Sequence, residues 1–309
     1  MAGIDERIGR RIKLADLHVL MAAVETGSMG KAAQRLNTSQ PAVSRCIADL
    51  ERALQVTLLD RTPRGIELTA HGRTLLDAAA SAFDSLRNGI QHIGLMSDPA
   101  AGTVRIGGNE AMITALLPPV VSTLRERYPS LSVTVQPVGA VHQQYAELRE
   151  RRLDFIIGRI HPPYEDDVEA QTLYQETTHV VAAATNPWNR RGRRFAFCEL
   201  ADEPWALPSP GTLVGALFAE AFRASGIDYP PRCAIIGNIH LHCELVASSS
   251  FLAILPGSVL RRNAERFGLR VLPMSSPVAP APVGILRLRH RPMTPVARLF
   301  IAALQRGME

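Results

Sequence analysis

Small and basic residues repeat at helical spacing in the segment NTSQPAVSRCIADLERAL. Pro41, Arg45, Ala48 and Arg52 follow one another at intervals of three or four residues. At about 100° per residue they share one face of a helix, and Ser44 lies on its flank. Arginine donates hydrogen bonds to phosphates and to base edges. The face is narrow and basic, and its chemistry predicts contact with a negatively charged groove.

An apolar stripe on the opposite side supports this helix. Its members recur at i, i+4, i+7 and i+11, and they are Val43, Ile47, Leu50 and Leu54. That pattern is the signature of a helix with one buried face. Thr38 or Ser39 can cap the N-terminus, and Pro41 then falls in the first turn, where its missing N–H breaks no helical bond. The proline therefore begins the helix rather than interrupting it.

Two further helices are expected upstream. The first is marked by Leu14, Leu17, Met21 and Val24 and ends at Gly27, and the second, SMGKAAQRL, covers 28–36. Only a brief turn at 37–38 separates the second helix from the basic one. Three helices with so short a joint predict a helix-turn-helix unit, whose last helix enters the major groove of double-stranded DNA with its N-terminal residues leading.

The segment LLDRTPRGIELT, which follows these helices, predicts a small β-hairpin. Apolar pairs flank a Pro-x-Gly turn, with Arg61 and Arg64 around it. A two-stranded wing with arginines at its tip suits phosphate contact or a minor groove. The alternative for either arginine is plain solvation.

A long helix with a repeated apolar seam is expected over 69–97, which contains no proline. The seam alternates steps of three and four residues and consists of Leu76, Ala79, Phe83, Leu86, Ile90 and Ile93. Such heptad seams pair with a second helix. The segment therefore predicts a homodimer through this helix, followed by a polar joint at SDPAAG.

Strand and helix patterns alternate through the rest of the chain. GTVRIGG, LSVTVQPV and DFIIG read as strands separated by helices at about 115–128 and 142–153, and this order predicts a mainly parallel sheet. Beyond Glu176 the alternation repeats with THVVAAAT, WALP, RCAIIG and FLAILP as strands. PVGILRLR and the helix PVARLFIAAL then return to the first lobe. A ligand would bind between two such α/β lobes, at the C-terminal ends of the strands.

Composition limits the classes of partner and compartment. The 309 residues carry 34 basic and 29 acidic side chains, and the first 70 hold 10 basic and 8 acidic, so DNA contact must come from placement rather than from bulk charge. Four scattered cysteines without a C-x-x-C pair fit a reduced protein. We find neither a signal-peptide pattern nor an apolar run long enough to span a bilayer. The expected location is cytoplasmic, with no membrane partner.

No catalytic motif is evident. RIGGNE contains glycines but lacks the dinucleotide fingerprint, and no nucleophile motif, phosphate loop or carboxylate pair is recognisable. HLHC at 240–243 lacks a second ligand cluster, so we expect no metal and no cofactor. Nothing marks Cys233 or Cys243 as an activated thiol. We expect a protein without enzyme activity.

The stretch from Leu14 to Gly72 is similar to a known family pattern. The motifs FxAxxxxGS, AAxxL, SQPAVSrxIxxLE and LxRxxRGxxLTxxG are approximated here by LMAAVETGSMGKAAQRLNTSQPAVSRCIADLERALQVTLLDRTPRGIELTAHG. The chain thus resembles the LysR-type transcriptional regulators. The resemblance covers the whole chain and is most specific over this stretch.

The resemblance implies an α/β protein with an all-α-type N-terminal winged helix-turn-helix and a C-terminal two-lobed, periplasmic-binding-protein-like effector domain. The expected divisions are a DNA-binding domain over 1–68, a dimerising linker helix over 69–97 and an effector-binding domain over 98–309. One lobe would cover about 102–175 and 282–309, and the other about 176–281. The family also implies homotetramers that bind interrupted palindromes near promoters, with RNA polymerase as a further candidate partner.

Family positions also imply specific site residues. The groove residues are Gln40, Pro41, Ser44 and Arg45: Arg45 can bridge to guanine O6 and N7 or to a phosphate, Gln40 can pair with an adenine edge, and Pro41 can press on a thymine methyl. The effector cleft would be lined by Asn109, Glu110, Ala111, Gly139, Ala140, His142, Arg159, Pro208, Ser209 and His240. Helix N-termini and Ser209 could bind a carboxylate, with Arg159 or a histidine supplying positive charge. The alternative is a structural ion pair at Arg159 and a packed surface residue at His240.

The resulting hypothesis is a transcription factor that responds to a small organic anion, such as a sugar acid or an aromatic carboxylate. The ligand would shift the population of lobe arrangements and so the placement and bending of DNA. Two other classes stay open: a constitutive architectural DNA binder and a solute-binding protein.

Overall fold

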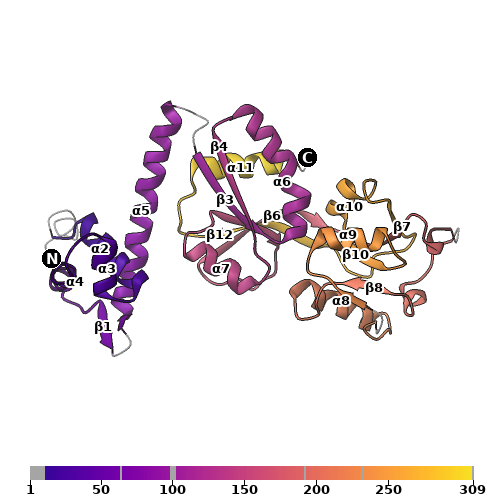
Figure 1. Cartoon of the computed structure of the whole chain (residues 1–309), viewed down its shortest axis with the longest axis horizontal. Coiled ribbons are helices and arrows are strands. Elements are labelled where there is room, and N and C mark those ends of the chain that lie inside the picture. Colours follow the sequence, from indigo (N-terminus) through magenta and orange to yellow (C-terminus); the bar gives the residue numbers. More distant parts are fainter. Residues whose placement is uncertain (1–10, 63–64, 98–101, 191–192, 231–232, 308–309) are drawn as a thin grey trace. The chain divides into compact units, whose positions relative to one another are not determined.

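The structure, a computed structural model, describes residues 11–62, 65–97, 102–190, 193–230, 233–307 and, within these, all side chains except those of 61–62, 91–92 and 94–97. The chain divides into two compact units, residues 1–90 and 91–309. We describe each unit by itself (Figure 1).

The N-terminal unit is built on three helices, α2 (Leu14–Thr26), α3 (Met29–Arg35) and α4 (Gln40–Leu54). Small side chains allow these helices to approach closely, since Ala22, Ala23, Ala32 and Ala33 are all buried at their contacts. Gly27 ends α2 with a φ of 67°, a left-handed conformation that glycine adopts without strain. The short joint between α3 and α4 passes through Asn37, which also has a positive φ.

A two-stranded wing follows the helices. β1 (Leu59–Thr62) pairs antiparallel with β2 (Gly65–Leu68), with Leu59 opposite Leu68. Gly65 has a φ of 131°, and a Cβ there would lie 2.6 Å from the carbonyl oxygen of Gly27. Ile66 N–H donates to that same carbonyl at 3.3 Å. The close approach of the wing to the end of α2 therefore requires glycine at position 65.

Helix α5 (Ala70–Ser97) follows the wing at once. Its first half packs in the N-terminal unit, where the Phe83 ring lies 5.9 Å from that of His18 on α2. Further along, Leu86 and Ile90 are 45% and 69% exposed. The apolar seam predicted for this helix is thus covered near its start and bare at these two positions.

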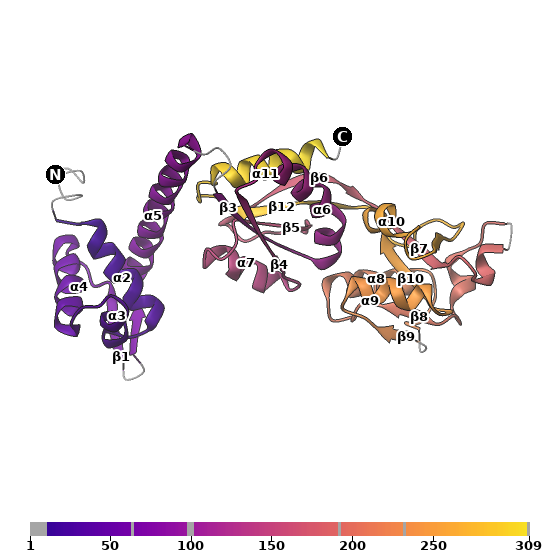
Figure 2. The same ribbon diagram turned by 45° about the horizontal axis from the view of Figure 1, so that its top comes forward.

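The first lobe of the C-terminal unit has a five-stranded sheet in the order β4-β3-β5-β12-β6. Its elements are β3 (Gly102–Gly108), α6 (Glu110–Arg127), β4 (Leu131–Pro137), α7 (Val141–Arg149), β5 (Phe155–Arg159), β6 (Val168–Glu176), β12 (Ala281–Leu288) and α11 (Pro295–Arg306). Helices α6 and α11 lie side by side over one face in both views (Figures 1 and 2). Side chains of β5 alternate accordingly: Phe155 and Ile157 face these helices, and Ile156 packs with α7.

The second lobe has a sheet in the order β11-β7-β10-β8-β9. Its elements are β7 (Thr178–Ala183), the 3-10 turns η1 (Pro187–Arg190) and η2 (Phe197–Leu200), β8 (Trp205–Leu207), α8 (Leu213–Ala224), β9 (Cys233–Ile235), α9 (Ile239–Ala247), β10 (Leu252–Pro256), α10 (Gly257–Asn263) and β11 (Leu269–Val271). Trp205, Phe218 and Phe222 form an aromatic core against η2. The chain crosses between lobes from β6 to β7 and again before β12.

The predicted, mainly parallel arrangement is present, since β3 pairs parallel with β4 and β5, and among the described strands of this sheet β12 alone runs in the opposite direction. In the second sheet β7 alone runs against the other described strands. Two sequence expectations need correction. Strand β6 was not predicted, since it is an edge strand with a largely polar sequence. Helix α6 begins at Glu110 rather than near Ala115, because Asn109 caps it and two prolines are tolerated inside it.

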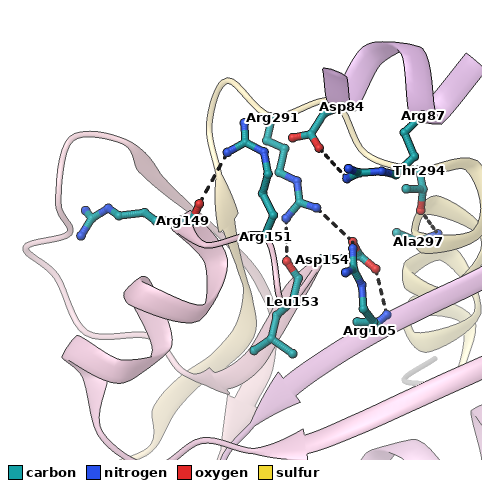
Figure 3. A network of polar contacts seen from close by, with 10 residues as sticks. All are labelled: Asp84, Arg87, Arg105, Arg149, Arg151, Leu153, Asp154, Arg291, Thr294 and Ala297. Carbon is teal, nitrogen blue, oxygen red and sulfur yellow. Dashed lines mark hydrogen bonds and ion pairs between the residues drawn. The ribbon is translucent and has the colours of Figure 1, made fainter. Parts of the chain in front are cut away.

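One buried carboxylate ties three segments of the first lobe together (Figure 3). Asp154, which precedes β5, accepts hydrogen bonds from the backbone N–H of Arg105 at 2.8 Å and from the guanidinium of Arg291 at 3.2 Å. Arg291 also donates to the Leu153 carbonyl at 2.6 Å. The Asp154 side chain is 5% exposed and that of Arg291 10%. Strands β3 and β5 and the turn after β12 are thereby held together.

Candidate functional sites

The start of α4 has the geometry of an exposed recognition surface. Ser39 is the N-cap, and its hydroxyl accepts a hydrogen bond from Ala42 N–H at 3.4 Å. Pro41 lies in the first turn. The apolar stripe of α4 is buried as predicted, with Val43, Ile47 and Leu50 at most 3% exposed. The helix is therefore anchored by one face, and its opposite face is open.

The predicted groove residues lie on or beside that open face. Gln40, Pro41 and Arg45 are exposed, and Ser44 is half-buried. Arg45 has no ion-pair partner within the described part of the chain, whereas Arg52, two turns further along, binds Asp49 at 2.8 Å. The charge of Arg45 is thus available to an external acceptor.

The wing positions are only partly described. Arg61 lies in β1, opposite Ile66 of β2, but its side chain is outside the description. Arg64 lies outside the described residues altogether. Their predicted contacts with DNA stay predictions.

Glu51 positions the wing, and sequence reasoning missed it. Its Oε1 accepts hydrogen bonds from Leu58 N–H at 2.8 Å and from Leu59 N–H at 3.3 Å. These bonds tie α4 to the first strand of the wing. Glu51 lies next to the apolar stripe near the end of α4. From the sequence alone it cannot be distinguished from a solvent-exposed carboxylate.

A cavity of about 230 Å³ lies between the two lobes of the C-terminal unit. Its walls come from the ends of strands β5, β9 and β10, the start of α6, the loops after β4 and β8, and helices α8 and α9. These are C-terminal strand ends and helix N-termini, where ligands of open α/β sheets bind. The position agrees with the expected one between the lobes.

The structure brings most of the predicted effector residues to this cavity. Asn109, Glu110, Ala111, Gly139, Arg159, Pro208 and Ser209 all line it. His142 and Ala140 do not. Both are exposed at the start of α7. His240 does not line it either, because its imidazole lies against the Phe267 ring at 5.4 Å and 3.7 Å from the Glu244 carboxylate.

Arg159 brings positive charge to the cavity wall without a protein acceptor. Its Nη1 is buried and has no hydrogen-bond partner in the described structure, and we find no carboxylate there within ion-pair distance. Burial lowers the pKa of the guanidinium, and the charge of Glu176 opposes that effect. Glu176 already accepts hydrogen bonds from Tyr174 Oη at 2.7 Å and from Ser258 N–H at 3.2 Å.

His242, not His240, is the histidine of this cavity. It is 5% exposed, and its Nε2 lies 2.7 Å from the Ala206 carbonyl oxygen. Burial lowers the pKa of the imidazole, so at neutral pH the ring adds no positive charge. The sequence could not choose between the two histidines, because they are two residues apart on a helix whose orientation depends on packing.

Two of the four cysteines, Cys46 and Cys243, lie where their thiols stay protonated at neutral pH. Burial and the neighbouring Asp16 carboxylate raise the pKa of Cys46 to about 12. Burial raises the pKa of Cys243 to about 11. Neither thiol has the low pKa that redox chemistry requires.

The described residues contain neither a metal-ligating cluster nor a membrane-spanning helix. Nowhere in that part of the chain do three or more metal-ligating side chains come together. Its helices include none with the length and apolarity needed to cross a bilayer. A wider groove of about 770 Å³ between α6, α10 and α11 is lined by none of the predicted effector residues, and the charged side chains that line it are arginines.

Both the N-terminal and the C-terminal unit match known family models. Residues 14–73 match the bacterial regulatory helix-turn-helix protein model of the lysR family. Residues 97–309 match the LysR substrate binding domain. The HTH-type transcriptional regulator GbpR of Azospirillum brasilense is 28% identical over 297 residues, covering 96% of this chain and 86% of that one. TfdT of Cupriavidus pinatubonensis, also an HTH-type transcriptional regulator, is 30% identical over 221 residues, 69% of this chain and 95% of that one.

Solved structures share the fold. A full-length OxyR variant from Pseudomonas aeruginosa has a TM-score of 0.65 at 22% identity, covering 95% of this chain and 97% of that one. Full-length CbnR in complex with its target DNA has a TM-score of 0.54 at 21% identity, covering 96% and 100%. The expected fold class, a winged helix-turn-helix joined to a two-lobed α/β domain, is confirmed. The matched proteins are regulators rather than enzymes, and the chain belongs to the LysR family of DNA-binding transcriptional regulators.

Proposed function

We propose that this regulator responds to a small organic anion that binds in the cavity between the two lobes. The observation that carries the proposal is Arg159, a guanidinium in the cavity wall whose buried Nη1 has no hydrogen-bond partner among the described residues. A buried donor without a partner is unfavourable. A ligand carboxylate that reaches this side chain would supply the missing acceptor and a charge-assisted hydrogen bond.

The remaining walls suit a small, partly apolar ligand. Met112, Phe218 and Ile254 contribute apolar surface, and Ser209 contributes a hydroxyl. The cavity volume of about 230 Å³ is below the roughly 300 Å³ at which pockets for drug-sized ligands begin. A single-ring or short-chain acid is the size class that fits.

We propose that DNA binds to the exposed start of α4 and to the wing. Gln40, Pro41, Ser44 and Arg45 would face the major groove, and Arg61 and Arg64 would contact the backbone or the minor groove. The exposed Leu86 and Ile90 support pairing of α5 with a second copy. We propose a homodimer through α5, assembled into a homotetramer on interrupted palindromes, with RNA polymerase as a further partner and the cytoplasm as its place of action.

The proposed mechanism is a shift of population. An anion that prefers one arrangement of the two lobes stabilises that arrangement. The linker-helix dimers are then placed differently, and the bend of the bound DNA changes.

A ligand screen with a matched pair of variants tests the anion proposal. Thermal shifts would be measured for the full chain against a panel of small carboxylic acids, in wild type, Arg159→Ala and Arg125→Ala. Arg125 is the control because it is exposed in the last turn of α6, away from the cavity. We expect at least one acid to stabilise wild type and Arg125→Ala but not Arg159→Ala.

The same acid must then act on DNA. Footprints and bending would be measured on the DNA upstream of the protein's own gene, with and without that acid. A changed footprint or bend in wild type, absent in Arg159→Ala, supports the proposal. A footprint that no bound acid alters would instead identify a constitutive DNA binder.

A further inference from the structure

The cavity contains a carboxylate that bridges its two walls. Glu110 is the first residue of α6 in the first lobe, and its Oε1 accepts a hydrogen bond from Asn238 Nδ2 at 2.7 Å. Its Oε2 accepts from Ile239 N–H at 3.3 Å. Asn238 is the N-cap of α9 in the second lobe. A negative charge from one lobe therefore sits at the N-terminus of a helix in the other.

This contact occupies the donors that an anionic ligand would use at α9. Helix N-termini present N–H groups without intrahelical partners, together with partial positive charge, and they bind anions readily. At α9 the N–H of Ile239 is bound to Glu110, and the N–H of Leu241 is bound to Asn238 Oδ1 at 2.8 Å. The chain itself thus supplies the anion at this end of the cavity.

The N-termini of α6 and α8 at the cavity are also capped from within. Asn109 Oδ1 accepts from Ala111 N–H at 3.0 Å at the start of α6. Thr212 Oγ1 accepts from Gly215 N–H at 3.1 Å at the start of α8. Among the described residues that line the cavity, Arg159 is the cation and Glu110 the anion. A ligand anion can therefore bind at Arg159, whereas Glu110 already occupies the position at the N-terminus of α9.

We propose that Glu110 is a specificity-determining residue, which restricts the cavity to ligands with one negative charge by occupying the N-terminus of α9. This inference rests on the proposed function, since it takes the cavity as the effector site. A ligand places its single carboxylate at Arg159. A second carboxylate that approached α9 would meet the Glu110 carboxylate, which already binds the Ile239 N–H and the Asn238 amide.

The first test uses a pair of acids that differ in charge and hardly in shape. 4-Nitrobenzoate and terephthalate are single-ring acids of the same length, with one and two negative charges. Calorimetric titration of the full chain would compare wild type, Glu110→Gln, Arg159→Ala and the control Glu126→Gln. Glu126 is exposed in the last turns of the same helix, so its substitution removes an equal charge away from the cavity.

Expected results follow from the charge at α9. Wild type and Glu126→Gln should bind the monoanion at least about tenfold more tightly than the dianion, because adjacent like charges are strongly unfavourable. Glu110→Gln should bring the two affinities within about threefold of each other, and Arg159→Ala should weaken both. An unchanged preference in Glu110→Gln, with binding still dependent on Arg159, would overturn the role of Glu110 and leave the proposed function standing.

A second test requires no organic ligand. Sulfate would be titrated against the thermal unfolding midpoint of wild type, Glu110→Ala and Glu126→Ala. Sulfate stabilises proteins generally by exclusion from their surfaces, and the Glu126→Ala control subtracts that effect. We expect an additional, saturable rise in Glu110→Ala alone, because its α9 N-terminus is open. Equal rises in all three proteins would mean that Glu110 does not close this site to anions.

The two tests separate the possible failures. If neither aromatic acid binds any variant, and no acid of the wider panel depends on Arg159, the proposed anion response is wrong. The sulfate titration then decides by itself whether Glu110 occupies an anion position.

Discussion

Whether an arginine on a helix surface takes part in recognition depends on what already neutralises it. Arg45 and Arg52 share one face of α4, yet only Arg52 has an ion-pair partner, Asp49, among the described residues. Sequence spacing placed both on the same face and could not tell them apart. The ion pair makes Arg52 a natural control for Arg45.

Replacing Arg45 by alanine should weaken binding to the specific DNA site by about 1 to 3 kcal/mol if the guanidinium makes a bidentate base contact. Fluorescence anisotropy with specific and scrambled DNA, over a series of salt concentrations, measures the loss. Arg52→Ala should lose less, because its charge is already shared with Asp49. Equal affinities and equal salt slopes for wild type and Arg45→Ala would show that Arg45 reads nothing in this groove.

His242 should make the stability of the C-terminal unit depend on pH. Burial lowers its pKa below the ordinary 6.5. Above pH 6.5 the imidazole is neutral in both folded and unfolded chains, and its contribution is fully present. As the pH falls toward the lowered pKa of the folded state, the unfolded chain binds more protons, so stability is lost. His161, whose pKa is also lowered by burial, acts in the same direction.

Thermal unfolding between about pH 7.5 and about pH 5.5 tests this expectation. The midpoint should fall with pH in wild type, and the fall should be smaller in His242→Gln. His240→Gln is the matched control, because that side chain is exposed on the same helix. A fall of the same size in His242→Gln and wild type would exclude His242 as its source.

At the scale of the element, the sequence pattern of α5 identifies an apolar seam, whereas packing in the folded chain decides which seam residues are buried. The heptad pattern indicated a pairing helix, but the pattern treats all six seam positions alike. In the folded chain the Phe83 ring packs against the His18 ring, whereas Leu86 and Ile90 are exposed to solvent. The dimer contact is therefore expected near Leu86 and Ile90.

A lysine at position 90 should disrupt pairing of the linker helix, because it places a charge within an apolar seam. Sedimentation velocity of Ile90→Lys should show a smaller species than wild type at the same concentration. Ser85→Lys adds the same charge to an exposed position beside the seam and should leave the assembly intact. A wild-type sedimentation coefficient for Ile90→Lys would place the dimer contact elsewhere.

At the scale of the whole molecule, a destabilising substitution in one compact unit should leave the stability of the other unit unchanged. Both tryptophans of the chain, Trp188 and Trp205, lie in the C-terminal unit. Tryptophan fluorescence therefore follows the unfolding of that unit alone. The N-terminal unit can be followed through DNA binding.

Removal of the Asp154 carboxylate should destabilise only the C-terminal unit. Asp154→Ala removes a buried carboxylate that binds Arg291 and the Arg105 N–H, and loss of one partner of a buried pair costs about 3 to 5 kcal/mol. The fluorescence transition should move to lower temperature, while DNA affinity at low temperature stays near wild type. Asp166→Ala, which removes an exposed carboxylate, should shift neither. An unshifted fluorescence transition in Asp154→Ala would show that the cluster adds no stability.

Local patterns were sufficient for the helices of the N-terminal unit, since cap, proline and apolar stripe of α4 all lie within one short segment. They were insufficient for β6, whose polar edge sequence carries no strand signal. They also failed for α9, where the choice between His240 and His242 depends on which side of the helix packs against the sheet.

By itself the sequence determined the winged helix-turn-helix, the apolar seam of α5 and the two-lobed architecture, because each rests on periodicity and turn residues that act over a few neighbouring positions. Only the tertiary structure decided which side chains share the cavity. Glu110 reaches Asn238 across 128 positions of the chain, and the buried Nη1 of Arg159 has no hydrogen-bond partner among the described residues. Such pairings depend on how two lobes fold against each other, and local spacing does not encode that arrangement.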